Sequence, residues 1–541
     1  MKKVMALALL LAVLCSGLPA RAADLCADPV ATLTGQVRGE ADGGSCVWRG
    51  IPYAAPPIGA LRWKAPAPAP AWSRVRDALV FGHMCMQSGI MAAEKGITKV
   101  GMSEDCLYLN VWRPQKSGSF PVMVWIHGGG YTGGNGATPW YWGDRLAAER
   151  EVVLVSINYR LNVFGFLAHP KLRAEDPNNS VGSYATLDQI YALKWVRDNI
   201  ANFGGDPGNV TIFGESAGGF SVCTLYASPP ARGLFHRAII ESGGCNVSMD
   251  LDRAYANSKE VFTAAGCAQD DIACLRALPA DKLLKVAGGG MMHWQPCHDG
   301  YVLKKMPIEM IREGDYAQVP LLAGFNHDEF GKALKLNQKL RRIQPAAYES
   351  SLIELFKVPA PEAKQLVAMY PLDQFDNRPV EAYGRMFGAD LSLICPTWNG
   401  LNAAAIKGSP SYLYRFDYND FVMGKYLGAA HSMEIPFVFN TLDRPPASLI
   451  YTRRNMAPAK QLEQVMQGYW TNFARTGDPN GPGLPTWPKY DPTAADAGMI
   501  FDTNVRAATI GMKEKCAFWE TYSTEHHSST EILMENRGKH K

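Results

Sequence analysis

The stretch Gly214-Glu215-Ser216-Ala217-Gly218 decides the fold expected for this chain of 541 residues. It follows an apolar run at 210–213 and precedes an apolar helical pattern that continues to Tyr226. A serine on such a tight strand-to-helix turn needs small residues two positions before and after it, because the backbone there is crowded. The N–H groups of the following helix point toward developing negative charge. We therefore predict that Ser216 is a nucleophile; an ordinary glycine-rich turn is the alternative interpretation.

Short apolar runs alternate with helical patterns on both sides of this turn. The runs are almost continuously apolar, which is typical of strands covered on both faces. Segments 187–200 and 459–475 carry apolar residues at helical spacing. The alternation predicts an α/β architecture with a mostly parallel sheet, in which ligands bind beyond the carboxyl ends of the strands. The predicted strands are 122–126, 152–157, 210–213, 237–240, 320–324, 412–416 and 499–501.

A second glycine motif, His127-Gly128-Gly129-Gly130, directly follows the predicted strand 122–126. Consecutive glycines let backbone N–H groups approach a substrate oxygen, which suits an oxyanion hole, where each donor contributes roughly 3 kcal/mol to transition-state stabilisation. A flexible glycine loop is the alternative interpretation. The position before the serine and at a strand end favours the oxyanion hole, as the α/β-hydrolase arrangement requires.

A nucleophilic serine needs a base and an acid that orients the base, and α/β-hydrolases place them in the order serine, acid, histidine. The predicted strand 320–324 leads to Asp328 and Glu329, and the residue pattern does not choose between these two acids. His431 is the one plausible base after them, because His526, His527 and His540 belong to a polar tail.

Composition excludes several other classes of protein. The chain is 47% hydrophobic and 19% charged, which is a globular balance. A formal net charge of +3 is too small for an electrostatic nucleic-acid binder. The sequence contains no Cys/His spacing typical of zinc sites. We therefore expect neither a nucleic-acid partner nor a bound metal.

Residues 1–22 have the pattern of a signal peptide. Lys2 and Lys3 precede an apolar run from Val4 to Leu14, and an A-x-A site ends at Ala22. The run is shorter than the roughly 17 residues that a spanning helix needs, and no later segment has 18 uninterrupted apolar residues. We predict cleavage after Ala22, export to the periplasm or the medium, and a mature chain without a membrane span.

With these motifs in place, the sequence resembles the type-B carboxylesterases, or cholinesterase-like esterases, of the α/β-hydrolase fold. The likeness covers nearly the whole mature chain. The matching blocks are RGIPYAAPP at 49–57, EDCLYLNVW at 104–112, FGGDP at 203–207 running on to Gly218, YWTNFA at 469–474 and TGDPN at 476–480.

The resemblance implies roles for individual residues. Ser216 corresponds to the nucleophile, His431 to the general base and Glu329 to the orienting acid, with Gly129, Gly130 and Ala217 as the oxyanion hole. Ser242 matches a family serine near the acid and base. Two residues depart from the family pattern beside these side chains, because Phe330 and Ser432 each stand where the family has glycine.

The resemblance also implies the disulfides Cys85–Cys106, Cys267–Cys274 and Cys395–Cys516. Twelve cysteines, less Cys15 of the predicted signal peptide, leave an odd number. Cys26 and Cys46 flank a predicted hairpin and are expected to pair. We also expect Cys245 to pair with Cys297, which leaves Cys223 as the free, buried thiol.

These features predict one catalytic domain from residue 23 to 541, with a helical insertion at about 330–408 over the active site. The predicted reaction is hydrolysis of small-molecule esters through an acyl-enzyme on Ser216, without metal or organic cofactor. Hydrolysis of an amide, thioester or lactone is one alternative, and a non-catalytic binding protein of the same fold is another.

The sequence also bears on the choice of ester. The segment between Cys85 and Cys106 has no aromatic residue, whereas cholinesterases use a tryptophan there to bind a quaternary ammonium group. The segment contains Met86, Met91, Met102, Lys95 and Lys99. We therefore expect neutral or anionic esters to be preferred over choline esters. Aromatic residues expected to line an apolar pocket are Trp140, Tyr141, Trp142 and Trp294, together with His293.

Overall fold

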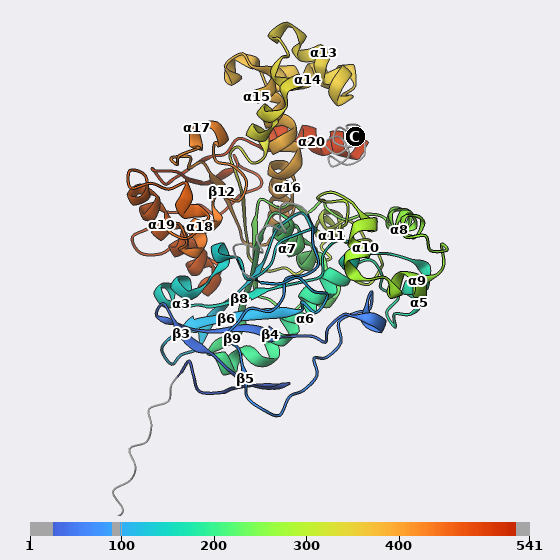
Figure 1. Cartoon of the computed structure of the whole chain (residues 1–541). Coiled ribbons are helices and arrows are strands. Elements are labelled where there is room, and N and C mark those ends of the chain that lie inside the picture. The colour runs from blue at the N-terminus through green and yellow to red at the C-terminus, as the bar shows by residue number, and fades with distance from the viewer. Residues whose placement is uncertain (1–24, 89–97, 99, 526–541) are drawn as a thin grey trace, which may run out of the picture.

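A sheet of eleven strands forms the centre of the computed structural model, which describes residues 25–88, 98 and 100–525 (Figure 1). The strand order is β14-β13-β12-β11-β10-β9-β7-β8-β6-β4-β3. The seven strands from β13 to β8 in this order run parallel, and β14, β6, β4 and β3 are antiparallel additions at the two edges. A separate small sheet contains β1 (Val30–Thr32), β2 (Gly35–Arg38) and β5 (Arg76–Asp77). The strands of the large sheet are β3 (Glu40–Asp42), β4 (Ser45–Pro52), β6 (Tyr108–Pro114), β7 (Phe120–Ile126), β8 (Val153–Ile157), β9 (Gly205–Glu215), β10 (Arg237–Glu241), β11 (Leu321–Asn326), β12 (Ser411–Phe416), β13 (Ala497–Phe501) and β14 (Arg506–Thr509).

The seven predicted strands are the seven parallel strands of this sheet, so the predicted α/β architecture is confirmed. Side chains of β7 show why their sequences are continuously apolar. Val122, Val124 and Ile126 are buried in one hydrophobic core, whereas Met123 and Trp125 are buried in a second core on the opposite face.

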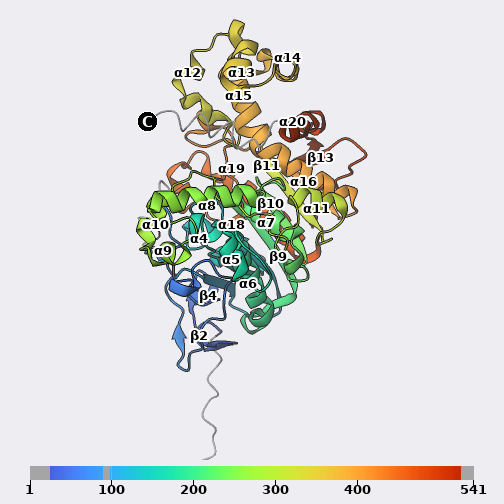
Figure 2. The same cartoon turned by 90° about the vertical axis from the view of Figure 1, so that its right-hand side faces the viewer.

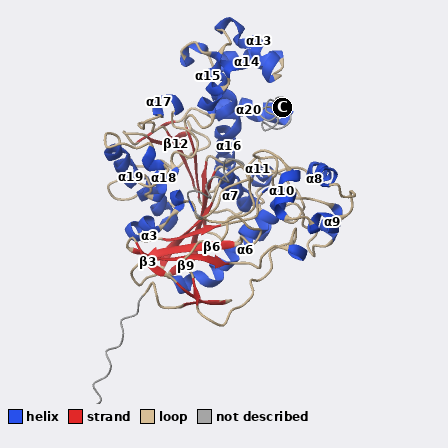
Figure 3. Ribbon diagram, in the orientation of Figure 1, coloured by secondary structure: helices blue, strands red, loops and turns tan. Residues whose placement is uncertain are grey.

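Helices cover both faces of the sheet (Figure 3). Helices α6 (Tyr184–Asn199), α7 (Ala217–Ala227) and α16 (Cys395–Ile406) contribute to the first core. Helices α3 (Asp144–Arg150), α18 (Ile435–Phe439) and α19 (Met456–Thr476) contribute to the second. The two predicted helices at 187–200 and 459–475 are thus confirmed as α6 and α19. The other α-helices are α4 (Asn162–Phe166), α5 (Pro170–Ala174), α8 (Leu251–Ala265), α9 (Ile272–Ala277), α10 (Ala280–Ala287), α11 (Pro307–Glu313), α12 (Gln338–Arg341), α13 (Tyr348–Phe356), α14 (Ala360–Met369), α15 (Pro379–Tyr383), α17 (Gly424–Leu427) and α20 (Lys513–Glu525).

Between β11 and β12 the chain forms helices and, apart from an isolated bridge at Glu329, no β-structure. Besides α12 to α16 it contains the 3₁₀-helix η6 (Gly331–Leu336) and a π-helix, η9 (Gly384–Ile394). Figures 1 and 2 show α13, α14 and α15 at the end of the molecule far from β2 and β4. A buried ion pair, Arg385 to Asp390 at 2.8 Å, holds η9, and Arg385 also donates to the carbonyl of His327 at 2.7 Å. The insertion is therefore tied directly to the segment that follows β11.

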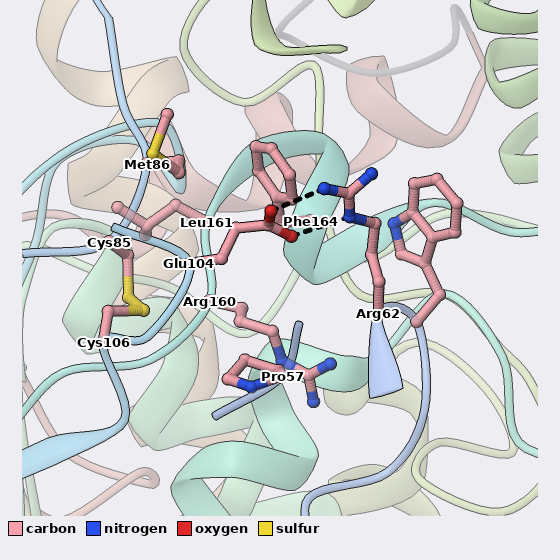
Figure 4. Close-up of a pocket in the computed structure, with 10 residues that line it drawn as sticks. Pro57, Arg62, Cys85, Met86, Glu104, Cys106, Arg160, Leu161 and Phe164 are labelled. Atoms are coloured by element: carbon pink, nitrogen blue, oxygen red, sulfur yellow. Dashed lines mark hydrogen bonds and ion pairs between the residues drawn. A yellow bond between two sulfur atoms is a disulfide. The ribbon is translucent and has the colours of Figure 1, made fainter. Parts of the chain in front are cut away.

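A largely buried ion pair between Arg62 and Glu104 anchors the segment that leads into β6 (Figure 4). Arg62 Nε donates to Glu104 Oε1 at 2.7 Å, and both side chains are largely buried. The same guanidinium donates to the last carbonyls of α9 and its C-cap, those of Leu275, Arg276 and Leu278. Because the Arg62 guanidinium has a carboxylate and three carbonyls as hydrogen-bond partners, it fixes the chain next to the Cys85–Cys106 disulfide.

Five disulfides are present in the described residues, and one of them corrects the predicted pairing. Four are as expected: Cys26–Cys46, Cys85–Cys106, Cys267–Cys274 and Cys395–Cys516. The fifth joins Cys223 to Cys245, whose Cα atoms are 5.4 Å apart. The free, buried cysteine is Cys297 and not Cys223, so the expected Cys245–Cys297 pair was wrong.

Two glycines explain the correction. A Cβ on Gly219 of α7 would lie 3.0 Å from the Cα of Gly243, and a Cβ on Gly243 would lie 2.6 Å from the Cα of Gly219. The nucleophile helix and the loop after β10 therefore approach as closely as backbones can. Cys223, one turn after Gly219, and Cys245, two residues after Gly243, are brought within bridging distance.

No helix among the described residues is long and apolar enough to cross a membrane. The predicted signal peptide, the residues Met91, Lys95 and Lys99, and the histidines of the polar tail lie outside the described residues.

The disulfide assignment makes a testable prediction about thiols. Mature protein denatured without reductant should react with one equivalent of a thiol reagent, and peptide mapping should find the label on Cys297. The folded protein should be unreactive, because burial raises the pKa of the Cys297 thiol and shields it. Cys297→Ser should abolish labelling, whereas Cys223→Ser should give two labelled residues, Cys245 and Cys297. Label on Cys223 in the wild type would contradict this assignment.

Candidate active site

Ser216 occupies a strained turn between β9 and α7, as the sequence predicts. Its φ of 57° is in the left-handed region, which costs a side-chain-bearing residue about 1–3 kcal/mol. Gly214 and Gly218 are required here, because a Cβ on Gly218 would lie 1.9 Å from the carbonyl oxygen of Ile126 at the end of β7. The same two glycines touch each other, since a Cβ on Gly214 would lie 2.6 Å from the carbonyl carbon of Gly218. The turn thus presses against the end of β7.

The glycine loop after β7 lies against this turn. A Cβ on Gly128 would be 3.0 Å from the Cβ of Ser216. Gly129 and Gly130 have φ values of +116° and +61°, which only glycine adopts without strain. The loop therefore brings the predicted oxyanion-hole residues beside Ser216, and Gly130 lines the same cavity as Ser216.

Two buried side chains that sequence reasoning missed hold the glycine loop. Gln87 donates to the carbonyl of Gly134 at 3.0 Å and accepts from the N–H of Gly134 at 2.9 Å. Tyr159 donates to the carbonyl of His127 at 2.6 Å and stacks on its ring. Burial lowers the pKa of His127 to about 4, so this imidazole is neutral near pH 7.

Glu329 and His431 meet although 102 residues separate them. The backbone of Glu329 forms a bridge with that of Ala430, and His431 Nδ1 lies 2.6 Å from Glu329 Oε2. The other carboxylate oxygen of Glu329 accepts from the hydroxyl of Ser242 at 2.7 Å and from the N–H of Asn326 at 2.8 Å. With so many partners, this buried carboxylate holds the imidazole in one orientation.

The second candidate acid, Asp328, has other partners. It accepts from the N–H of Ala429 at 2.8 Å and forms ion pairs with His327 and Lys332, each at 3.4 Å. These interactions keep the pKa of Asp328 below its ordinary value although burial opposes them. The residue pattern left both acids open; Glu329, which the resemblance implies, is the one in contact with His431.

A second carboxylate faces the other nitrogen of His431. Glu215, which precedes Ser216, places Oε1 3.0 Å from His431 Nε2 and accepts a hydrogen bond from Ser432 at 2.6 Å. Among the described residues this Nε2 atom makes the ion-pair contact with Glu215 but no hydrogen bond of suitable geometry. Burial lowers the pKa of His431, but the carboxylates of Glu215 and Glu329 outweigh it and raise the pKa above its ordinary value. Glu215 was not singled out from the sequence, because any residue is allowed at that position of the G-x-S-x-G pattern.

The two departures from the family pattern converge on the same imidazole. The Phe330 ring centroid lies 4.2 Å from that of His431. Ser432 has a φ of 69°, a conformation that favours glycine, and its hydroxyl is held by Glu215. The changed side chains therefore add contacts around the imidazole and leave the bond between Glu329 and His431 in place.

A cavity of about 1030 Å³ opens at Ser216. Its lining is mainly apolar and includes residues of the helical insertion and four methionines, Met249, Met291, Met292 and Met306. Its aromatic residues are Phe220, Phe330, Phe356 and Trp519. Methionine side chains adapt to differently shaped ligands, so the cavity suits a sizeable apolar group.

The aromatic residues expected to line the pocket are instead part of the folded core. Tyr141 packs against Trp125, Trp142 stacks on Phe81, and Trp294 is almost fully buried. Trp140 packs on the second core, and His293 stands edge-on to Trp294. The expectation was wrong because the 3₁₀-helix after the glycine loop, η3 (Pro139–Tyr141), packs against α18. No group of side chains able to hold a metal ion occurs in the part of the chain that the structure describes.

Comparison with known proteins places nearly the whole chain in one family. The family model described as the carboxylesterase family matches residues 27–519. The para-nitrobenzyl esterase of Bacillus subtilis is 36% identical over 504 residues, which is 90% of this chain and 97% of that protein. The fumonisin B1 esterase of Sphingopyxis macrogoltabida is also 36% identical, over 85% of this chain and 84% of that protein.

Solved structures agree with the sequence relatives. A para-nitrobenzyl esterase superposes with a TM-score of 0.76 at 35% identity, covering 91% of this chain and 99% of that chain. A carboxylesterase of Geobacillus stearothermophilus superposes with a TM-score of 0.79, at the same identity and coverage. With its strand-turn-helix serine and its α/β-hydrolase sheet, the chain belongs to the carboxylesterase family and is a serine esterase that hydrolyses carboxylic esters.

Proposed function

We propose that Ser216 is the nucleophile of this esterase, that His431 is its general base and that Glu329 orients His431. The observation that carries the proposal is the 2.6 Å contact between His431 and Glu329, because Glu329 follows the carboxyl end of β11 as the strained Ser216, which lines a large cavity, follows that of β9. His431 Nε2, the ring nitrogen that does not contact Glu329, lies 3.0 Å from Glu215 Oε1, and we assign to it the role of accepting the proton of Ser216.

The proposed reaction has two steps. As Ser216 attacks the ester carbonyl, its proton passes to His431 Nε2, and the oxyanion is held by the N–H groups of Gly129, Gly130 and Ala217. The carbonyl then re-forms, the bond to the alcohol breaks, and the proton passes from His431 to the leaving oxygen. Water, deprotonated by His431, hydrolyses the acyl-enzyme in the same way. Glu329 stabilises the imidazolium in both steps, and Glu215 adds a second negative charge on the Nε2 side.

We propose neutral or anionic esters as substrates rather than choline esters. The segment between Cys85 and Cys106 lacks any aromatic residue, and Met86 and Met102, the described methionines of that segment, offer no π face to a quaternary ammonium group. We also propose that residues 23–541 form a single catalytic domain and that the protein is exported after cleavage at Ala22; five disulfides fit an oxidising compartment.

Replacement of the nucleophile tests the proposal directly. Ser216→Ala should fold and keep its disulfides but lose turnover of 4-nitrophenyl acetate by a factor on the order of 10⁶. The matched control is Ser248→Ala, a serine of the same cavity whose hydroxyl is bonded to His298. It should retain turnover within about tenfold. Near wild-type hydrolysis by Ser216→Ala would remove the nucleophile assignment.

The two neighbouring acids provide a second test. Glu329→Gln should lower kcat by roughly 10⁴, because the neutral amide does not stabilise the imidazolium. Asp328→Asn should have a much smaller effect. Glu329 raises the pKa of His431, so its loss should lower that pKa. The acid limb of the kcat/KM profile should then move to lower pH in Glu329→Gln and stay in place in Asp328→Asn. The reverse ranking would assign the role to Asp328.

Substrate charge provides a third test. Acetylcholine and 3,3-dimethylbutyl acetate have the same shape, but only acetylcholine is charged. The enzyme should hydrolyse the neutral ester with the higher kcat/KM, because acetylcholine would lose hydration without gaining an aromatic partner. A clear advantage for acetylcholine in initial-rate measurements would show that a cation site exists in the cavity.

A further inference from the structure

The side chain of Phe330 contacts the proposed general base, His431, and also lines the substrate cavity. Its ring centroid lies 4.2 Å from that of His431, with 44° between the ring planes. The side chain also lines the cavity that contains Ser216 and Gly130, and the residue is 38% exposed although the adjacent Glu329 is buried. One side of the ring thus packs on His431, and the rest is open to a ligand.

The backbone holds this ring in a defined place. The N–H of Phe330 donates to the carbonyl of Gly388 in η9 at 3.2 Å, and the N–H of Gly331 donates to the carbonyl of Asp328 at 2.7 Å. Next to the ring, η6 and η9 meet through glycines, since a Cβ on Gly388 would lie 2.8 Å from the Cα of Gly331. Segments this close leave little room for the backbone of Phe330 to move, which keeps its side chain at the wall of the cavity.

The chemistry of ester hydrolysis decides which half of a substrate reaches this wall. When the tetrahedral intermediate collapses, the C–O bond breaks with its electron pair on the alcohol oxygen, and that oxygen takes the proton from His431 Nε2. The alcohol oxygen must therefore come within hydrogen-bond reach of the imidazole, whereas the acyl group takes no proton from it. The carbon atoms attached to the alcohol oxygen are the part of the substrate nearest to His431, and the Phe330 ring packs on His431.

We propose that Phe330 is a specificity-determining residue for the alcohol half of the ester, and that it favours aryl and arylmethyl alcohols. This proposal rests on the assignment of His431 as the base. An aromatic alcohol can make an offset or edge-to-face contact with the exposed part of the Phe330 ring, a gain beyond apolar burial that an aliphatic alcohol of equal size lacks. Phe220, Phe356 and Trp519 also line the cavity, but no ring contact joins them to His431.

A pair of matched substrate series tests the proposal on the full-length mature enzyme. The alcohol series compares kcat/KM for benzyl acetate and cyclohexylmethyl acetate. The acyl series compares methyl phenylacetate and methyl cyclohexylacetate. Each pair differs only in whether the ring is aromatic, so their ratio measures a preference for aromatic groups in one half of the ester. The variants are Phe330→Leu and Phe330→Tyr, with Leu336→Ala as the control. Leu336 belongs to the same η6 segment and is 84% exposed, and it does not line the cavity.

Phe330→Leu should lower the benzyl to cyclohexylmethyl ratio by about 3- to 10-fold, the usual worth of one aromatic contact. Its acyl ratio should stay within about twofold, and Phe330→Tyr and Leu336→Ala should keep both ratios. The proposal is overturned if Phe330→Leu leaves the alcohol ratio unchanged, or if it shifts the acyl ratio alone or both ratios equally. A folded but inactive Phe330→Leu enzyme, with its disulfides intact, would show that Phe330 positions the imidazole and does not select substrate. A wild type that hydrolyses 4-nitrophenyl acetate but not benzyl acetate would also overturn this proposal, whereas one that hydrolyses neither would contradict the proposed function.

Discussion

The close approach of backbone at the end of β7 is the constraint on which the site depends. Gly218 leaves no space for a Cβ beside the carbonyl of Ile126, and Gly214 packs on Gly218 from the other side of the turn. A side chain at either position would push α7 away from the sheet and separate Ser216 from the glycine loop. The same helix then meets the loop after β10 through Gly219 and Gly243, where the Cys223–Cys245 disulfide closes the contact. Close backbone contacts at these glycines thus position Ser216.

The charge of the His431 imidazole depends on two opposing effects in the site. His431 lies between the carboxylates of Glu329 and Glu215, which favour its charged form, while burial disfavours that form. The balance suits a base that must accept a proton and later release it. Burial also raises the pKa of two nearby acids, that of Glu241 to about 8 and that of Glu434 well above its usual range. Burial therefore disfavours further negative charge in the site.

Hydrogen bonds and an ion pair connect the helical insertion to the segment that carries Glu329. Arg385 of η9 donates to the carbonyl of His327, and its partner Asp390 accepts from Tyr370, which in turn accepts from Trp519 of α20. A buried ion pair that lost one partner would leave an uncompensated charge, so these contacts bind the insertion, α20 and the acid loop into one unit. The same insertion supplies part of the cavity wall, so the elements that shape the cavity also support the acid.

The sequence by itself determined the parallel part of the sheet, the serine turn and the glycine loop. These features depend on local signals: strands covered on both faces are continuously apolar, and a crowded turn demands glycines at set positions. The antiparallel edge strands were missed because they lack such a continuous signal. The residue pattern left Asp328 and Glu329 open, and the family resemblance pointed to Glu329. Tertiary structure brought Glu329 against His431, placed Glu215 on the other side of the imidazole and sent Tyr141 and Trp142 into the core. It also paired Cys223 with Cys245 and left Cys297 free. In each of these cases the outcome depends on distances between segments far apart in the chain, which neither composition nor spacing records.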